Sequence, residues 1–258
     1  MKIDVDALFD NYLDDFIEKN LDKYSPNQLE KMVESLYEEF GNKANLVLCG
    51  LSPIEYYKQM TTEDLLTEFK ESFEEIGSAC EFLCRELQKR QDAEDNLVDF
   101  AKSKNTEIAT CAVNVLSEMN SKKALLTFLK SVESRLVEDE LYEVMVEAMS
   151  KNADCIKEEL LSLYDSNNYA HKVFLEIFAS MSKDERVYQI LFDEYLRRTE
   201  NRTELYGFFA KYGDERILGF LYGEVETKQL TPIELEEIKL AIEKLGGDFN
   251  NLINKNSH

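Results

Sequence analysis

Two polar turns of this chain are nearly identical and lie thirty residues apart. They restrict the possible folds more than any other feature of the sequence. Residues 183–187 read Lys-Asp-Glu-Arg-Val, and residues 213–217 read Gly-Asp-Glu-Arg-Ile. Each turn follows an apolar pattern of helical spacing and opens a second one. Self-similarity at such a fixed period is typical of repeat proteins built from helix pairs. Because a single helix pair cannot bury both of its apolar faces, such pairs stack into a continuous core.

The same unit can be followed through most of the chain, although its earlier copies are less alike. The residues that close the first helix of each unit lie 30 to 33 residues apart: Leu87, Met119, Met149, Met181, Tyr212 and Leu245. A polar turn and a second apolar run follow each of them. We therefore expect an all-α chain in which residues 62–258 form about six helix pairs.

Two segments, residues 179–191 and 210–221, show the unit most clearly. Each has a small residue near the end of the first helix, an Asp-containing turn and an apolar second helix. In these features the unit resembles a HEAT repeat in the short bacterial style. The resemblance covers residues 62–258 and implies a right-handed α-α superhelix of stacked helix pairs, but no particular activity. The usual proline of the first helix is missing, and only the last two turns carry Gly before Asp. Armadillo-like and other helix-pair arrays therefore remain alternative folds.

Residues 1–61 are expected to form a helical cap module that continues into this array. Apolar residues at three- and four-residue steps predict one helix over residues 5–20 and another over residues 26–40. Ser25 and Ser52 each precede a proline and have Gln or Glu three positions later, which is the pattern of a capping box.

Acidic residues dominate the charge of the chain. Asp and Glu number 52 against 30 Lys and Arg, which gives a formal net charge of −22. Such a surface repels phosphate backbones and argues against nucleic acid as a partner. The charge either serves solubility alone or attracts basic proteins, including those that normally bind DNA.

Cysteine usage and the N-terminus indicate the compartment. Five cysteines without paired spacing argue against a disulfide framework, and Cys80 and Cys84 are expected in the core. The first residues lack the basic and apolar regions of a signal peptide. No apolar run approaches the roughly 20 residues that span a bilayer. We therefore expect a cytoplasmic protein without a membrane partner.

The sequence offers no recognisable catalytic motif. Its two histidines, His171 and His258, have no further metal ligands at suitable spacing. The glycine-rich motifs that bind dinucleotides and triphosphates are missing. Adjacent acidic residues point in different directions on a helix and are typical of solvated faces. We therefore expect no cofactor, no metal and no enzymatic activity.

One group of side chains on the predicted second helices is a candidate binding surface. Tyr188, Phe192 and Tyr195 stand there at helical spacing, and Tyr222 follows one repeat later. They would anchor a partner segment if the second helices line the concave face of the array. Arg197 and Arg198 add a small basic island to an acidic chain. The alternative is that the rings pack between neighbouring repeats, as aromatic rings at helical spacing usually do.

The function that fits these features best is that of a non-enzymatic scaffold. It would bind a protein or peptide partner, basic partners included, on the concave surface that the second helices form. An acidic mimic of nucleic acid, or a sink for a basic protein, is the alternative. A solenoid enzyme that processes nucleic acid fits less well, because it needs a basic groove with stacking aromatics and the chain has no Trp. The oligomeric state stays open.

Overall fold

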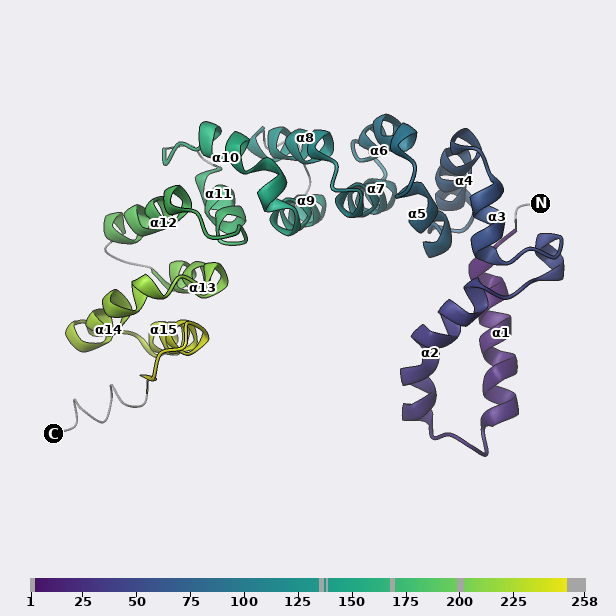
Figure 1. Cartoon of the computed structure of the whole chain (residues 1–258), viewed down its shortest axis with the longest axis horizontal. Coiled ribbons are helices and arrows are strands. Elements are labelled where there is room, and N and C mark those ends of the chain that lie inside the picture. Colours follow the sequence, from purple (N-terminus) through teal and green to yellow (C-terminus); the bar gives the residue numbers. More distant parts are fainter. Residues whose placement is uncertain (1–2, 135–136, 138, 168–169, 199–201, 250–258) are drawn as a thin grey trace. The chain divides into compact units, whose positions relative to one another are not determined.

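The computed structural model describes residues 3–134, 137, 139–167, 170–198 and 202–249, and it contains helices but no strand in these ranges (Figure 1). The predicted all-α class is thereby confirmed for the described residues. The helices are α1 (Val5–Asn20), α2 (Pro26–Gly41), η1 (Leu46–Leu48), α3 (Pro53–Gln59), α4 (Thr62–Glu75), α5 (Glu81–Leu87), η2 (Gln91–Ala93), α6 (Glu94–Phe100), α7 (Thr106–Glu118), α8 (Lys122–Glu133), α9 (Asp139–Lys151), η3 (Ala153–Ile156), α10 (Lys157–Leu163), α11 (His171–Phe178), α12 (Glu185–Arg197), α13 (Thr203–Tyr212), η4 (Glu215–Ile217), α14 (Leu218–Thr227) and α15 (Pro232–Lys244). Residues 250–258, which include His258 and most of the last predicted second helix, lie outside the described residues.

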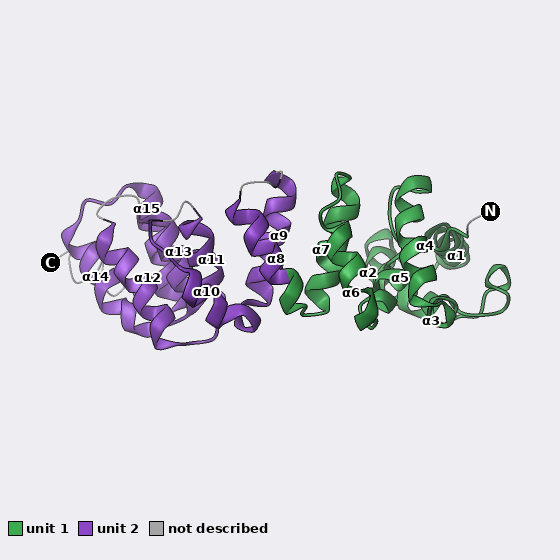
Figure 2. Cartoon of the chain, turned by 90° about the horizontal axis from the view of Figure 1, so that it is seen from above, with its two compact units in different colours: residues 1–124 green, residues 125–258 purple. Residues whose placement is uncertain are grey.

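The chain divides into two compact units, residues 1–124 and residues 125–258 (Figure 2). The predicted cap and the first predicted helix pairs share unit 1, because α3 packs against α5 and α5 packs against α4. The predicted boundary at residue 61 therefore does not coincide with the division between the units. Within the described ranges, no helix combines the length and the apolar character needed to cross a membrane.

Local sequence signals set the helix starts of unit 1. At α3 the Glu55 backbone N–H donates to Ser52 Oγ at 3.3 Å, and the Ser52 N–H donates to Glu55 Oε2 at 3.0 Å. The hydrogen bond from the Ser52 N–H lowers the pKa of the Glu55 carboxyl. The start of α2 is similar, since the Ser25 N–H donates to Gln28 Oε1 at 2.9 Å. Both predicted capping boxes are therefore confirmed.

An aromatic cluster joins α1, α2 and α5. The rings of Tyr37 and Phe82 are stacked, with 4.5 Å between their centroids, and Phe9 meets Tyr37 edge-on at 4.8 Å. Phe82 is buried and lies directly against Gly41, the last residue of α2. The helices can approach this closely because Gly41 has no side chain.

Replacing Gly41 with alanine is expected to lower the free energy of unfolding by about 1–3 kcal/mol, the usual cost of overfilling a packed core. The new Cβ atom would overlap the ring of Phe82, which is buried and stacked on Tyr37, so a shift of the ring would disturb this stacking. Urea unfolding followed by circular dichroism measures the change. Gly207→Ala is the control, because an added Cβ atom on α13 meets no other atom within 4 Å. That variant should gain about 0.5–1 kcal/mol, and equal losses in both variants would contradict the close approach at Gly41.

In unit 2 the first helices of successive predicted pairs lie side by side. Helix α9 packs against α11, α11 against α13, and α13 against α15. The helix that follows each turn packs next to them, α12 against both α11 and α13, and α14 against α15. In this unit, neighbouring helix pairs therefore cover faces of one another's helices.

The repeated Asp-Glu-Arg turn links each helix pair of unit 2 to the one before it. Asp184 accepts hydrogen bonds from the backbone N–H of Arg186 at 3.0 Å and from its guanidinium group at 2.8 Å, and these bonds lower the pKa of Asp184. Arg186 also reaches back to Glu158 in α10, with N–O distances of 2.7 and 2.8 Å. Arg216 occupies the same position in the next turn and reaches back to Glu185 at 2.8 Å. The motif therefore both caps a helix and sets the register between successive turns.

Candidate functional site

The predicted aromatic stripe lies between helices of unit 2 and leaves little ring surface exposed. Tyr188 is 7% exposed and Tyr195 is 4% exposed. Phe192 is half-buried and meets Phe220 of α14 edge-on, with 4.7 Å between the ring centroids. Tyr195 meets Phe209 of α13 edge-on at 5.8 Å. This burial favours the packing alternative over contact with a partner, because a buried ring has no free face to offer.

Tyr222 and the two arginines of the expected basic island are also engaged inside unit 2. The Tyr222 hydroxyl accepts a hydrogen bond from the Asp248 backbone N–H at 2.9 Å. Arg197 and Arg198 both donate to Glu194, whose side chain is almost completely buried. Arg198 also lies 3.5 Å from Glu204, so two carboxylates pair with the two positive charges, which do not form the free basic island expected from the sequence.

A second buried carboxylate, Glu224, lies one repeat later and holds α12 and α14 together. It accepts hydrogen bonds from the Tyr195 hydroxyl at 2.5 Å, from Lys228 Nζ at 2.6 Å and from Arg202 Nη1 at 2.8 Å. Burial favours its neutral form, but these hydrogen bonds prevail and lower the pKa of Glu224. The same balance holds at Glu194. Burial opposes its ionisation, but the hydrogen bonds from its arginine partners prevail and lower its pKa.

Sequence reasoning missed both buried carboxylates, although a signal was present. Glu194 and Glu224 are thirty residues apart, and each has a basic residue four positions later, Arg198 and Lys228. A glutamate and a basic residue at this spacing face each other on a helix. What the sequence cannot show is that the same helix face is covered by the next helix pair.

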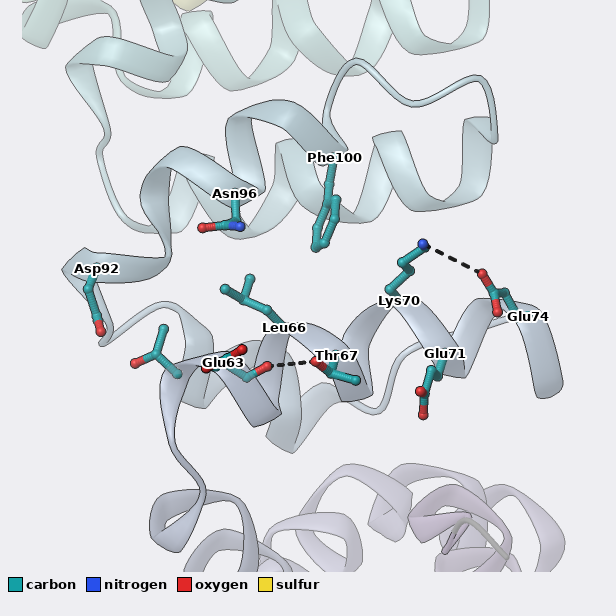
Figure 3. Close-up of a pocket in the computed structure, with 10 residues that line it drawn as sticks. Glu63, Leu66, Thr67, Lys70, Glu71, Glu74, Asp92, Asn96 and Phe100 are labelled. Atoms are coloured by element: carbon teal, nitrogen blue, oxygen red, sulfur yellow. Dashed lines mark hydrogen bonds and ion pairs between the residues drawn. The ribbon is translucent and has the colours of Figure 1, made fainter.

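The strongest candidate for a binding site is a groove of about 660 Å³ between α4 and α6 in unit 1 (Figure 3). Leu66 from α4 and Phe100 from α6 point toward each other and form its apolar floor (Figure 3). Phe100 stacks on the fully buried ring of Phe69, with 5.7 Å between centroids and 5° between ring planes. The floor is therefore held in place by the core of the unit.

Acidic side chains surround this floor. The charged residues that line the groove are four carboxylates and one amine: Glu63, Glu71, Glu74, Asp92 and Lys70. Lys70 Nζ lies 4.0 Å from the carboxylate of Glu74. Glu63 and Asp92 are exposed, and neither carboxylate has an ion-pair partner among the residues that the structure describes. The groove therefore presents negative charge that the fold itself does not compensate.

A comparable hollow in unit 2 differs in this respect. It measures about 690 Å³ and lies between α10 and α12, where Glu158 and Glu185 line it. Both carboxylates are already paired, Glu158 with Arg186 at 2.7 Å and Glu185 with Arg216 at 2.8 Å. Since its charges are satisfied by the repeat-to-repeat contacts, this hollow has less to offer a charged ligand than the α4–α6 groove.

The α4–α6 groove can hold an apolar side chain and the cationic groups beside it. Leu66 and Phe100 offer apolar surface, while Asn96 and Thr67 supply polar groups at the edge. Among the described residues there is no cluster of three or more His, Cys, Asp or Glu side chains that could hold a metal ion.

No family model matches the chain, and comparisons with curated proteins and with solved structures gave no match either. The HEAT-like resemblance therefore depends on the turns and helix patterns of the sequence. The functional argument depends on the geometry and charge of the groove.

Proposed function

We propose that the chain is a non-enzymatic scaffold that binds a partner protein through a short segment held in the α4–α6 groove. The observation that carries this proposal is the combination of an apolar floor, Leu66 and Phe100, with the unpaired carboxylates of Glu63 and Asp92. A segment that carries both an apolar and a basic side chain is complementary to such a hollow, because it covers the apolar surface and brings positive charge to the carboxylates.

The proposal includes the arrangement of the helix pairs, a HEAT-like, right-handed α-α superhelix. It is supported by the side-by-side packing of α9, α11, α13 and α15 in unit 2. It is also supported by the Asp-Glu-Arg turns, in which Arg216 of one turn pairs with Glu185 of the turn before. Repeats that contact only their neighbours present extended surfaces for partners, and an extended surface suits a scaffold better than a catalyst.

The partner segment carries Lys or Arg on both sides of an aliphatic or aromatic residue. The apolar residue would cover Leu66 and Phe100, and the basic residues would approach Glu63 and Asp92 from the rim. Contacts of this kind between exposed charges add specificity and association rate more than affinity. The buried apolar residue would then supply most of the binding free energy.

An acidic mimic of nucleic acid is the second candidate function, and the net charge of −22 favours it. A mimic would present its charge along a surface and would not need an apolar floor. The two candidates therefore differ in the partner residue that they require: an apolar anchor for the scaffold, and basic residues alone for the mimic.

Selection from a random peptide library displayed on phage tests the proposal directly. Peptides selected on the purified protein should share one aliphatic or aromatic residue flanked by Lys or Arg. Enrichment of basic peptides without an apolar position would favour the mimic, and the absence of any enriched pattern would contradict a peptide-binding groove.

The selected peptide should bind the double variant Glu63→Lys, Asp92→Lys about tenfold more weakly, because two attractions of up to about 1 kcal/mol each become repulsions. The matched control is Glu30→Lys, Glu34→Lys, which changes the net charge equally at two exposed sites of α2. Fluorescence anisotropy at two salt concentrations measures the affinities. Equal weakening in both double variants would mean that net charge, and not the groove, attracts the peptide.

A further inference from the structure

Two cysteines from different helices of unit 1 touch. Cys84 belongs to α5 and Cys111 belongs to α7, and their Sγ atoms lie 3.7 Å apart. Both residues are free thiols in the structure. The two sulfurs are thus in van der Waals contact although 27 residues separate them in the sequence.

The contact makes the two sulfurs chemically unequal. The hydrogen bond between the two sulfurs lowers the pKa of the Cys111 thiol, although burial opposes it. The same hydrogen bond raises the pKa of Cys84. Cys111 is only half-buried, whereas Cys84 is buried. The sulfur that more readily becomes a thiolate is therefore also the one that a small molecule in solution can reach.

Cys80, the other buried cysteine of unit 1, lacks these properties. Burial and the nearby Asp6 carboxylate raise the pKa of its thiol to about 12. Its sulfur lies 3.8 Å from the Tyr37 hydroxyl, which offers no second sulfur for a disulfide. A thiol held neutral in this way is a poor nucleophile.

We propose that Cys84 and Cys111 form an oxidation site that a hydroperoxide converts to a disulfide between α5 and α7. The Cys111 thiolate attacks a peroxide oxygen, so that an S–O bond forms and the O–O bond breaks. The leaving group takes up a proton: hydroxide from hydrogen peroxide becomes water, and the alkoxide from an organic hydroperoxide becomes an alcohol. Cys84 then loses its proton and attacks the Cys111 sulfur; the S–S bond forms, the S–O bond breaks, and a second water leaves. The two sulfurs lose two electrons in total, and the peroxide gains them.

The disulfide would close a loop that contains α6 and therefore one wall of the α4–α6 groove. Asp92, Asn96 and Phe100 all lie between the two cysteines in the sequence. Helix α7 also packs directly against α6 and α4. Oxidation would thus restrain the helices around the groove. The cysteine pair does not depend on the proposed function, and it can be tested without any partner.

The test uses the full chain with Cys49 and Cys155 replaced by serine, because these two exposed thiols would otherwise react between molecules. Treatment with hydrogen peroxide should lower the number of thiols titrated after denaturation from three to one. Because Cys80 and Cys84 share one tryptic peptide, the protein is digested with trypsin and with a protease that cuts after Glu81 and so separates the two cysteines. Peptide mapping should then find the Cys84 and Cys111 peptides joined, with the mass of two hydrogens lost, and dithiothreitol should separate them. Three remaining thiols, or a bond that involves Cys80, would overturn the proposal.

The order of attack is tested with Cys84→Ser in the same background, after circular dichroism has shown that the variant is folded. Without a resolving thiol, Cys111 should stop at the sulfenic acid and be labelled by dimedone. Labelling of Cys80 in place of Cys111 would overturn the assignment of the reactive sulfur. If the variant does not fold, the peptide map of the parent protein decides the proposal by itself.

Discussion

Replacing Glu224 with alanine is expected to lower the free energy of unfolding by about 3–5 kcal/mol, the usual cost of breaking a buried ion pair on one side. Glu224 is 5% exposed and accepts hydrogen bonds from Tyr195, Arg202 and Lys228. Without it the guanidinium group of Arg202, which is itself 11% exposed, stays buried without its carboxylate. Urea unfolding followed by circular dichroism measures the loss.

Glu226→Ala is the matched control, because Glu226 is exposed on the same helix and should change stability by less than about 0.5 kcal/mol. The loss at Glu224 should also depend on pH. Its pKa is lowered in the folded state, so its contribution is complete above the ordinary glutamate value of 4.5 and is lost as the pH falls through the folded value. A difference between wild type and variant that stays constant down to pH 3 would show that the carboxylate charge is not what stabilises unit 2.

The helices could be predicted from the sequence because their signals are local. The first predicted helix, residues 5–20, coincides with α1, and the capping residues Ser25 and Ser52 mark the starts of α2 and α3. Spacing of apolar residues and capping act over one or two turns, so they can be read without knowledge of the partner helices. The turns at Asp184 and Asp214 were found in another way, from their near-identity thirty residues apart, and in the structure each Asp caps the helix that follows it.

The ion pairs made by the arginine of each turn could not be predicted from the residues next to it in the sequence. Arg186 and Arg216 pair with carboxylates 28 and 31 residues earlier in the chain, which only the stacking of helix pairs brings within reach. The aromatic stripe posed the same difficulty. Helical spacing shows that Tyr188 and Tyr195 share a face, but in an array of helix pairs more than one face is covered by neighbours.

The α4–α6 groove was missed for a different reason. Its floor is made by one residue from each of two helices, Leu66 and Phe100, and each looks like an ordinary core residue in its own helix. Its acidic rim did not stand out because negative charge is spread over the whole chain. What distinguishes Glu63 and Asp92 from other exposed carboxylates is their position in one groove with Leu66 and Phe100. They also differ from Glu158, Glu185, Glu194 and Glu224, which the fold pairs with basic residues.

Replacing Tyr195 with alanine is expected to cost about 3–5 kcal/mol, as truncation of a buried aromatic side chain usually does. The ring fills the space between α12 and α13, where Phe209 meets it edge-on and the guanidinium of Arg202 lies 4.3 Å from its centroid. The loss of its hydroxyl also removes one of the donors to Glu224. Tyr195→Phe keeps the ring and should recover most of the lost stability, so urea unfolding of the two variants separates packing from hydrogen bonding.

Phe220→Ala provides the comparison that decides between a buried and a partner-facing stripe. Phe220 touches both Phe192 and Tyr195, but its own side chain is 46% exposed. Its truncation should therefore cost clearly less than that of Tyr195, since the loss grows with the buried apolar area. If both variants keep wild-type stability and only peptide binding changes, the stripe faces a partner after all. If Tyr195→Ala alone unfolds at markedly lower urea, the rings hold the helix pairs together and binding must be sought elsewhere, with the α4–α6 groove first.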